Sequence, residues 1–460
     1  TACPNPYINE FIETYGKPYN EETDTYHREP FVGDVSEGKN NPVYNAHTYH
    51  TKVPHTAIEK YIEHYTSVGD VVLDGFCGTG MTGVAATLRN RNCILTDLSP
   101  IATFIAYNYN NKIDVESFRK EGLRIINEIQ KECGWLFETN HFDETKKDKQ
   151  LRIDGEKIPK GVINHILYSD VLICPFCNNE YTFFEAAVNY EEGEIFDTYN
   201  CPTCNGEISK RNSKRAFEKK WDDLINKEVS FAKQSPVLIN YTYNKKRFEK
   251  PLDNEDWVLI EKIEKSTIPY WIPIKQLPNG FNTSQPIKSH GLDYVHQFYT
   301  KRNIWVISSF IEKIASLKNF KYSLMLSQSA ANPTLSKMRR FRADRKGGGP
   351  LTGTLYVGSL ITPPSPILSI KRNIEYVAKA LEVVFNCKGK TIIQTTSAIN
   401  TSLTDNSTDY IFTDPPFGDN LMYSELNLLW EAWLKVFTNN KEEAIINNHQ
   451  NKSLVDYSTI

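Results

Sequence analysis

The chain has 460 residues, 40% of them hydrophobic and 24% charged, with a formal net charge of -3. A chain of this length can bury a sizeable core, which excludes disorder and collagen-like repeats for most of it and removes any need for disulfide staples. No apolar stretch approaches the roughly 18 residues of a membrane span. We also see no secretory signal. The slightly acidic balance excludes a protein that coats nucleic acid through its overall charge, so any such contact must use local patches.

The first part of the chain alternates between strand and helix patterns. Residues 1–46 lack a clear period and predict an irregular arm. A buried strand is predicted on each side of a glycine-rich turn, and amphipathic helices follow the second strand. This alternation predicts an α/β fold with a doubly wound parallel sheet. The expected elements are a helix over 54–65, a strand over 71–74, the turn over 75–83, a strand over 93–97, and helices over 101–109 and 115–133.

A charged stretch at 138–160 interrupts this pattern, and residues 160–300 have the short strands and cysteine pairs of a different module. Two further buried strands are then predicted to resume the parallel sheet, followed by one apolar helix and a polar tail without strands. These later elements are helices over 300–318 and 371–385, strands over 391–394 and 410–413, and a helix over 421–437.

The glycine-rich turn carries the pattern Asp74-Gly-Phe76-Cys-Gly78-Thr-Gly80. Glycine lets the backbone bend sharply after a strand and approach a ligand closely. An acid at the strand end disfavours a dinucleotide, whose pyrophosphate would meet it, and suits a positively charged sulfonium cofactor. Asp97 ends the next strand, where its carboxylate can accept both ribose hydroxyls. A tight turn with no ligand is the alternative interpretation.

A second motif, Asp414-Pro415-Pro416-Phe417, follows the last predicted strand. Acids at the carboxyl ends of parallel strands lie where ligands bind. The prolines fix the backbone and leave their carbonyls as free acceptors. The Asp414 carboxylate and the Pro415 carbonyl can accept both hydrogens of a planar amino group, while Phe417 offers a face for its ring. A Pro-stiffened loop with a capping Asp is the alternative.

Together these two motifs resemble the S-adenosylmethionine-dependent amino-methyltransferases of DNA, which methylate the exocyclic nitrogen of adenine or cytosine. The segment Tyr49-His-Thr51-Lys52-Val-Pro resembles that family's further cofactor segment, which implies cofactor contacts for Thr51 and Lys52. The run Asp-Pro-Pro-Phe-Gly-Asp-Asn, with Glu425-Leu-Asn-Leu-Leu-Trp-Glu-Ala-Trp433 after it, is closer to large prokaryotic enzymes with an inserted zinc ribbon. The motif favours adenine over cytosine. Ser397 stands where many relatives have an acid that contacts the adenine of the cofactor.

The resemblance implies a Rossmann-like methyltransferase sheet interrupted by a long insertion that contains the zinc ribbon. We expect the middle segments to contact DNA, and a second chain or a further C-terminal segment to complete the sheet. The expected units are an arm over 1–46, a cofactor-binding half over 47–137, the insertion over 138–300 with its ribbon at 170–208, a helical and basic-loop segment over 301–385, and a catalytic half over 386–460.

Two CxxC pairs, Cys174/Cys177 and Cys201/Cys204, have the spacing of a closed zinc site with four thiolates. With no open position, such a Zn²⁺ would be structural; redox pairs and idle thiols are the alternatives. A basic run over 336–349 is a candidate for phosphate contacts, with a solvated loop as the alternative. Its cations are Lys337, Arg339, Arg340, Arg342, Arg345 and Lys346.

Three functional hypotheses remain open. The first is a prokaryotic, cytoplasmic DNA amino-methyltransferase, of the kind found in restriction-modification, that acts on a flipped base. The second is an RNA guanine amino-methyltransferase, which shares an Asp-Pro-Pro-aromatic motif. The third is a DNA-binding subunit that is inactive without a partner chain. The Thr1 start and the polar tail after Phe437 favour a piece of a longer methylase or a split subunit.

Overall fold

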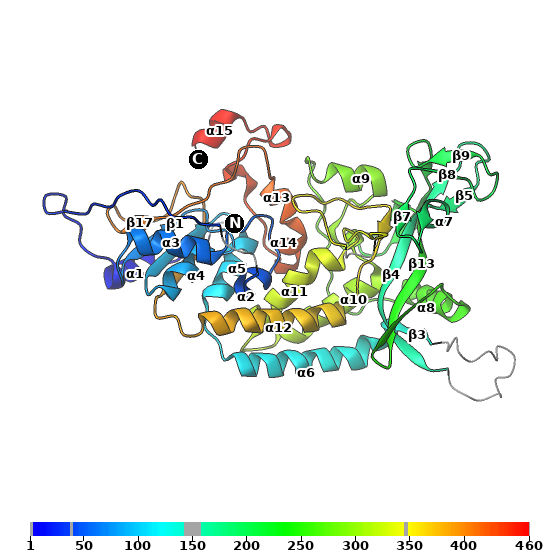
Figure 1. Cartoon of the computed structure of the whole chain (residues 1–460), viewed down its shortest axis with the longest axis horizontal. Coiled ribbons are helices and arrows are strands. Elements are labelled where there is room, and N and C mark those ends of the chain that lie inside the picture. Colours follow the sequence, from blue (N-terminus) through cyan, green and yellow to red (C-terminus); the bar gives the residue numbers. More distant parts are fainter. Residues whose placement is uncertain (1–2, 37–39, 142–157, 345–347, 460) are drawn as a thin grey trace.

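The computed structural model describes residues 3–36, 40–141, 158–344 and 348–459. The architecture is mixed α/β, with a parallel sheet in one half of the elongated molecule and an antiparallel sheet in the other (Figure 1). A layer of long helices runs between the two sheets. Within the described ranges, no helix is both long and apolar enough to cross a membrane.

The parallel sheet has the order β16-β2-β1-β17, and all its pairings are parallel. Hydrophobic side chains on the central strands are fully buried, as the near-continuous apolar pattern predicts. Two strands precede the long insertion and two follow it, so the sheet joins segments about 300 residues apart. The strands are β1 (Val71–Asp74), β2 (Asn92–Asp97), β16 (Thr391–Thr395) and β17 (Tyr410–Ile411).

The four strand predictions are confirmed in position, but the prediction that the last strand is buried is wrong. β17 has only two residues, and the Ile411 side chain is 60% exposed. Within the described part of the chain, β17 pairs with β1 alone. An edge strand with one neighbour leaves one side open to water, whereas β1 and β2 are covered on both sides.

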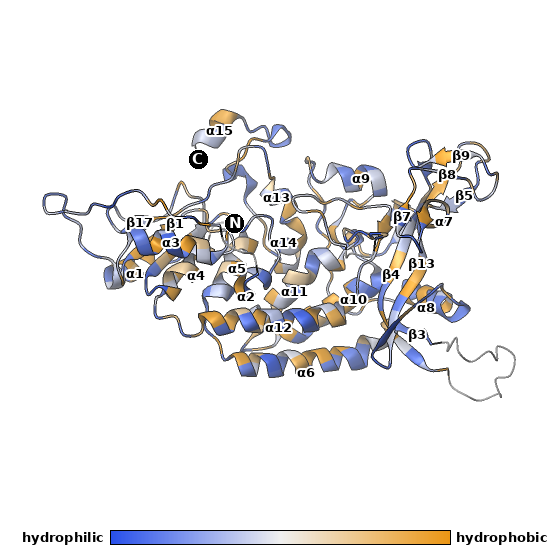
Figure 2. Cartoon of the chain, viewed as in Figure 1, coloured by the Kyte–Doolittle hydropathy of each residue, from blue (hydrophilic) through white to orange (hydrophobic). Residues whose placement is uncertain are grey.

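Helices cover both the sheet and one another. The residues of the long helices after β2 and before β16 belong to the same hydrophobic core as the buried side chains of the parallel sheet. The insertion is therefore packed into the main core rather than attached by a linker. Figure 2 shows apolar and polar positions alternating along the two longest helices. These elements are α3 (His55–Tyr65), α4 (Met81–Leu88), α5 (Pro100–Asn110), α6 (Val115–Cys133), α10 (Lys301–Ala315), α11 (Lys321–Leu335) and α12 (Pro366–Val384).

The antiparallel sheet is organised around one long strand, β4 (Lys160–Ile173), which pairs with five other strands. Its partner β13 (Gln234–Tyr243) continues to β14 (Lys246–Lys250). The remaining partners are short: β3 (Glu138–Asn140), β5 (Glu180–Thr182), β10 (Lys214–Arg215) and β15 (Leu360–Ile361). Around this sheet lie the hairpins β6 (Val188–Asn189)/β7 (Glu194–Ile195), β8 (Thr198–Asn200)/β9 (Glu207–Ser209) and β11 (Phe217–Asp222)/β12 (Lys227–Ala232), the helices α7 (Phe183–Ala187), α8 (Asn254–Lys265) and α9 (Ser284–His290), and the 3-10 turn η2 (Val295–Phe298).

The arm packs on the outer face of the parallel sheet. Ile8 of α1 (Ile8–Tyr15) joins a small core with side chains of β1, β2 and β16. The backbone N–H of Cys3 donates to the carbonyl of Thr395 over 2.6 Å, which covers the free edge of β16. The arm also contains α2 (Pro42–Asn45). Elsewhere in the chain, the 3-10 turn η1 (Gly134–Phe137) follows the end of α6.

The apolar helix predicted over 421–437 is two short helices, so that prediction is partly wrong. α13 (Tyr423–Leu426) and α14 (Leu428–Leu434) meet at Asn427, whose side chain bonds to residues outside the helices. Lys435 adopts a left-handed conformation (φ 61°) and ends α14. The tail contains η3 (Asn440–Glu442), η4 (Asn448–Gln450) and α15 (Leu454–Thr459), and no strand within its described residues.

Candidate functional site

The glycine loop between β1 and α4 is fixed by two carboxylates, the buried Asp74 and the half-buried Asp97. Asp74 accepts hydrogen bonds from the Phe76 backbone N–H (3.0 Å) and the Thr82 hydroxyl (2.5 Å). Asp97, at the end of β2, accepts from the backbone N–H groups of Gly78 (2.8 Å) and Ser99 (2.9 Å). Burial raises the pKa of Asp74 to about 7 and that of Asp97 to about 6. A positively charged ligand would favour the ionised form of both groups.

The two glycines of the loop have different roles. Both have a positive φ, 49° at Gly78 and 75° at Gly80, which favours glycine. A Cβ at Gly80 would lie 2.6 Å from the Cβ of Ala106 on α5, so this glycine serves the packing of the loop on a helix. A Cβ at Gly78 would meet only the Tyr49 ring, at 4.0 Å. Gly78 therefore leaves open space for a ligand.

A pocket opens at the carboxyl ends of the parallel strands, between the glycine loop and the Asp-Pro-Pro-Phe loop. Six of the residues predicted for cofactor binding or catalysis line it: Thr51, Phe76, Gly78, Asp97, Asp414 and Pro416. Ser397 also lines the pocket, together with residues that were not among the predicted cofactor-binding or catalytic residues: Tyr49, Gly75, Leu98, Ser99, Ala398, Tyr423, Thr438, Glu442, Glu443 and Ala444.

Five of the predicted residues do not line this pocket. The Lys52 ammonium donates to the backbone carbonyls of Tyr44 and His47, where burial lowers its pKa to about 7. Lys52 therefore ties the arm to the cofactor segment instead of reaching into the pocket. Asp74 and Gly80 lie behind the loop surface, Pro415 is exposed, and the Phe417 side chain is 65% exposed.

Aromatic side chains form one wall of the pocket. The Tyr49 ring stacks between those of Tyr423 and Trp430, with centroid distances of 6.3 Å to each. The Thr51 hydroxyl lies 2.8 Å from the Tyr423 hydroxyl. This wall joins the segment before β1 to the helices after the Asp-Pro-Pro-Phe loop. The sequence did not predict a site role for Tyr49, which is the first residue of the quoted segment, or for Tyr423, which lies six residues after Phe417.

A buried polar network lies beneath that wall. The Glu431 carboxylate, 1% exposed, accepts from the Ser99 hydroxyl (2.9 Å) and from the Thr438 backbone N–H (2.8 Å) and hydroxyl (2.6 Å). The Asn427 amide donates to the Ser99 hydroxyl over 3.0 Å. Burial raises the pKa of Glu431 to about 7. The network fixes both Ser99 and Thr438, which line the pocket from opposite ends of the chain.

The segment after Phe437, expected to be a polar tail, is part of the site. The Ser424 hydroxyl and N–H donate to the Glu443 carboxylate, over 2.5 and 2.8 Å. The Ile446 N–H donates to the Gly418 carbonyl (3.1 Å), and the Tyr457 hydroxyl donates to the Pro416 carbonyl (2.6 Å). These bonds hold the tail against the Asp-Pro-Pro-Phe loop. The polar sequence shows no clear period because the helical elements of this segment are short and side-chain contacts hold it in place.

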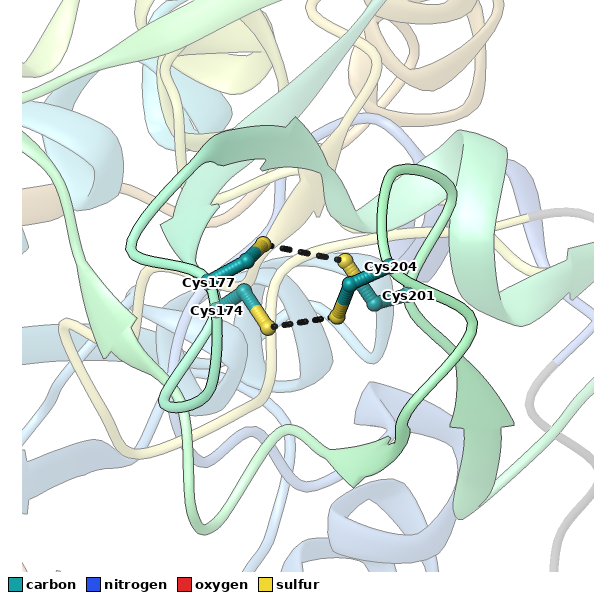
Figure 3. A group of neighbouring side chains, drawn as sticks. All are labelled: Cys174, Cys177, Cys201 and Cys204. Atoms are coloured by element: carbon teal, nitrogen blue, oxygen red, sulfur yellow. Dashed lines mark hydrogen bonds between the residues drawn. The ribbon is translucent and has the colours of Figure 1, made fainter.

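The four cysteines of the CxxC pairs come together at the far end of the antiparallel sheet (Figure 3). Their sulfur atoms all lie within 4.8 Å of one another, with 3.8 Å between Cys174 and Cys204 and between Cys177 and Cys201. A zinc–sulfur distance of about 2.3 Å in a tetrahedron places the sulfurs about 3.8 Å apart. Each pair lies in a similar turn, closed by Asn178 and Asn205 in the left-handed conformation. The arrangement is compatible with Zn²⁺.

The basic run is less open to solvent than a surface loop. Lys337 is half-buried over the Phe231 ring, and burial lowers its pKa to about 8. Arg339 is also half-buried, and its buried Nε has no hydrogen-bond partner among the residues that the structure describes. Arg340 donates to the Gly349 carbonyl (3.3 Å), and Arg342 pairs with Asp344 (2.5 Å). Arg345 and Lys346 lie outside the described residues.

Two known groups of proteins are similar to parts of this chain. A family model described as a DNA methylase of the N6/N4 amino type matches residues 8–108. A type II methyltransferase, M.MjaII, of Methanocaldococcus jannaschii is 29% identical over 138 residues, which cover 28% of this chain and 26% of that protein. No solved structure matches. These matches confirm the predicted resemblance to the N6/N4 DNA amino-methyltransferases.

The raised pKa of Glu431 predicts that the free energy of unfolding depends on pH. In the folded chain this group holds its proton up to about pH 7, whereas in the unfolded chain it loses it above about pH 4.3. Folding therefore binds a proton, and stability is lost as the pH rises. From about pH 5.5 to about pH 8, wild type should lose about 2 kcal/mol of unfolding free energy relative to Glu431→Gln. Urea unfolding followed by circular dichroism measures this, with the exposed Glu312→Gln as control. A wild-type-to-variant difference that stays constant with pH would contradict the assignment.

The geometry of the cysteine cluster predicts that the purified protein binds zinc. The purified chain should contain about one equivalent of zinc, and Cys204→Ser should lose most of it because a structural site needs all four ligands. Elemental analysis by mass spectrometry measures this. Cys3→Ser removes an exposed thiol far from the cluster and should leave the zinc content unchanged. Equal zinc content in the two variants would count against the site.

Proposed function

We propose that the chain transfers a methyl group from S-adenosylmethionine to the exocyclic amino group of a flipped base in DNA, with adenine favoured over cytosine. The observation that carries this proposal is the shared pocket. Asp97 and Asp414 come from segments more than 300 residues apart, yet both line it. A cofactor held by the first and an amino group held by the second would therefore be neighbours. The family match supports the same chemistry.

Asp97 is suited to hold the cofactor's ribose. An ionised carboxylate has about four lone-pair sites, and two of them accept the backbone N–H groups of Gly78 and Ser99. The remaining sites can accept two ribose hydroxyls. The open space at Gly78 leaves room for the cofactor, and Ser397 and Ala398, which line the same pocket, would be available to contact its adenine ring. The bound cofactor would supply an electrophilic methyl group.

Asp414 is suited to position the target. It follows β17 and lines the pocket, and its carboxylate can accept one amino hydrogen while the Pro415 carbonyl accepts the other. This pair would direct the nitrogen lone pair towards the cofactor side, so that catalysis is mainly positioning and electrostatics. The exposed Phe417 ring, on the outer side of the same loop, can stack on the extruded base.

In this proposal the two halves of the molecule have different roles. The parallel sheet would be the Rossmann-like half that binds the cofactor. The cysteine cluster would be a zinc ribbon that stabilises the fold of the insertion, and the insertion would contact DNA. The open edge of β17 supports the expectation that a further strand, from a second chain or a longer C-terminal segment, completes the sheet. Arg342, with a 53% exposed side chain, is the described member of the basic run most open to a phosphate.

The direct test is methyl transfer from labelled S-adenosylmethionine to unmethylated duplex DNA, with tRNA offered in parallel. We expect label in DNA, and Asp414→Ala should lower the rate by about 100-fold or more because it removes a group that aligns the amino nitrogen. Asp405→Ala, an exposed acid in the loop before β17, is the matched control and should keep full activity.

Three results would contradict the proposal. Transfer that survives Asp414→Ala would remove this residue from catalysis. Label found in tRNA and absent from DNA would instead support the RNA guanine methyltransferase hypothesis. Inactivity of the wild-type chain that is relieved by adding a second chain would support the split-subunit hypothesis.

A further inference from the structure

One exposed aromatic side chain lies in a loop that is bonded to α13. Phe281 lies in the loop before α9, and its side chain is 69% exposed. Its neighbours Gly280, Asn282 and Thr283 are all buried. Leaving a Phe side chain in water forgoes about 1.5–3 kcal/mol of burial. The chain therefore holds this ring outward while it buries the residues on both sides.

The loop that carries Phe281 is rigid. The Thr283 hydroxyl donates to the carbonyls of Pro278 (2.7 Å) and Gly280 (3.2 Å). The Ser284 hydroxyl donates to the carbonyl of Phe281 itself (3.1 Å). A ring on a backbone fixed in this way loses little conformational entropy when it inserts into a partner.

The same loop is fastened to the catalytic side of the molecule. The Glu425 carboxylate of α13, 2% exposed, accepts from the Asn282 N–H over 2.7 Å. Gly280 approaches this carboxylate so closely that an added Cβ would lie 2.3 Å from Oε1. The Asn447 amide donates to Glu425 over 3.3 Å, and Ile446 next to it bonds to Gly418 of the catalytic loop. A short chain of contacts thus links Phe281 to Phe417.

We propose that Phe281 is the wedge that enters the DNA duplex and fills the space left by the extruded base. This inference rests on the proposed function. The bonds of Glu425 to Asn282 and Asn447, and of Ile446 to Gly418, hold the loops of both exposed rings on one framework, so Phe417 can stack on the base in the pocket while Phe281 occupies the stack it left. Apolar wedges of this kind partly unstack a duplex, at a cost that contact with the ring repays. Phe281 is a positioning residue, because it touches the duplex rather than the reacting atoms.

The test compares two duplexes that share the methylation site found by sequencing modified DNA. In one the target base is paired, and in the other it lies opposite an abasic position, which lowers the cost of extrusion. Phe281→Ala should slow single-turnover methylation of the paired duplex by about tenfold or more, and of the abasic duplex by about twofold or less. Phe281→Trp should retain most of the rate on both. Tyr7→Ala removes a ring that is 66% exposed on the arm and serves as the matched control.

The outcomes separate the two proposals. Equal rates for Phe281→Ala and wild type on the paired duplex would overturn the wedge, as would an equal loss on both duplexes. In either case methylation by wild type would leave the proposed function intact. Absence of methylation by wild type on both duplexes would overturn the proposed function, and the wedge with it.

Discussion

The hydrogen bond from the Gly78 N–H to the Asp97 carboxylate is the contact on which the site depends. It joins the loop after β1 to the end of β2, and the same carboxylate holds the turn that begins α5 through Ser99. The Ser99 hydroxyl donates in turn to the Glu431 carboxylate, which also accepts from the Thr438 hydroxyl. One carboxylate thus sets the position of the glycine loop and, through three further bonds, of the opposite pocket wall. Loss of a buried partner of this kind costs about 1–3 kcal/mol for each group left unpaired.

The same constraint explains how a site can be assembled from distant parts of the chain. Strands β16 and β17 arrive after the long insertion, and their ends carry Ser397 and Asp414 into the pocket. The insertion does not disturb this geometry, because α6 and α12 pack against each other so closely that a Cβ at Gly122 would lie 3.0 Å from the Ile374 side chain. The antiparallel sheet and the cysteine cluster extend from that shared core. Within the described residues, side chains of the insertion share the main hydrophobic core with the parallel sheet.

Much of this arrangement could be predicted from local sequence. The buried strands and α6 follow from apolar periodicity, and the glycine loop, the Asp-Pro-Pro-Phe loop and the cysteine pairs are short motifs whose chemistry depends on spacing. The roles of Glu431 and Asn427 could not be predicted in this way. Both belong to an apolar helix pattern, and only the tertiary fold brings them to Ser99, more than 300 residues earlier. The half-burial of Lys337 and Arg339 could not be predicted either, because a run of cations carries no sign of the tertiary packing that places Lys337 over the Phe231 ring.

The central claim is that Asp97 holds the ribose of S-adenosylmethionine and the loop that receives it. Calorimetric titration with S-adenosylhomocysteine, the product without the reactive methyl group, tests it most directly. Wild type should bind one ligand per chain, and Asp97→Ala should weaken binding by about 100-fold, which corresponds to about 2.7 kcal/mol. Asp405→Ala should leave the affinity unchanged. Equal affinity of wild type and Asp97→Ala would contradict the account.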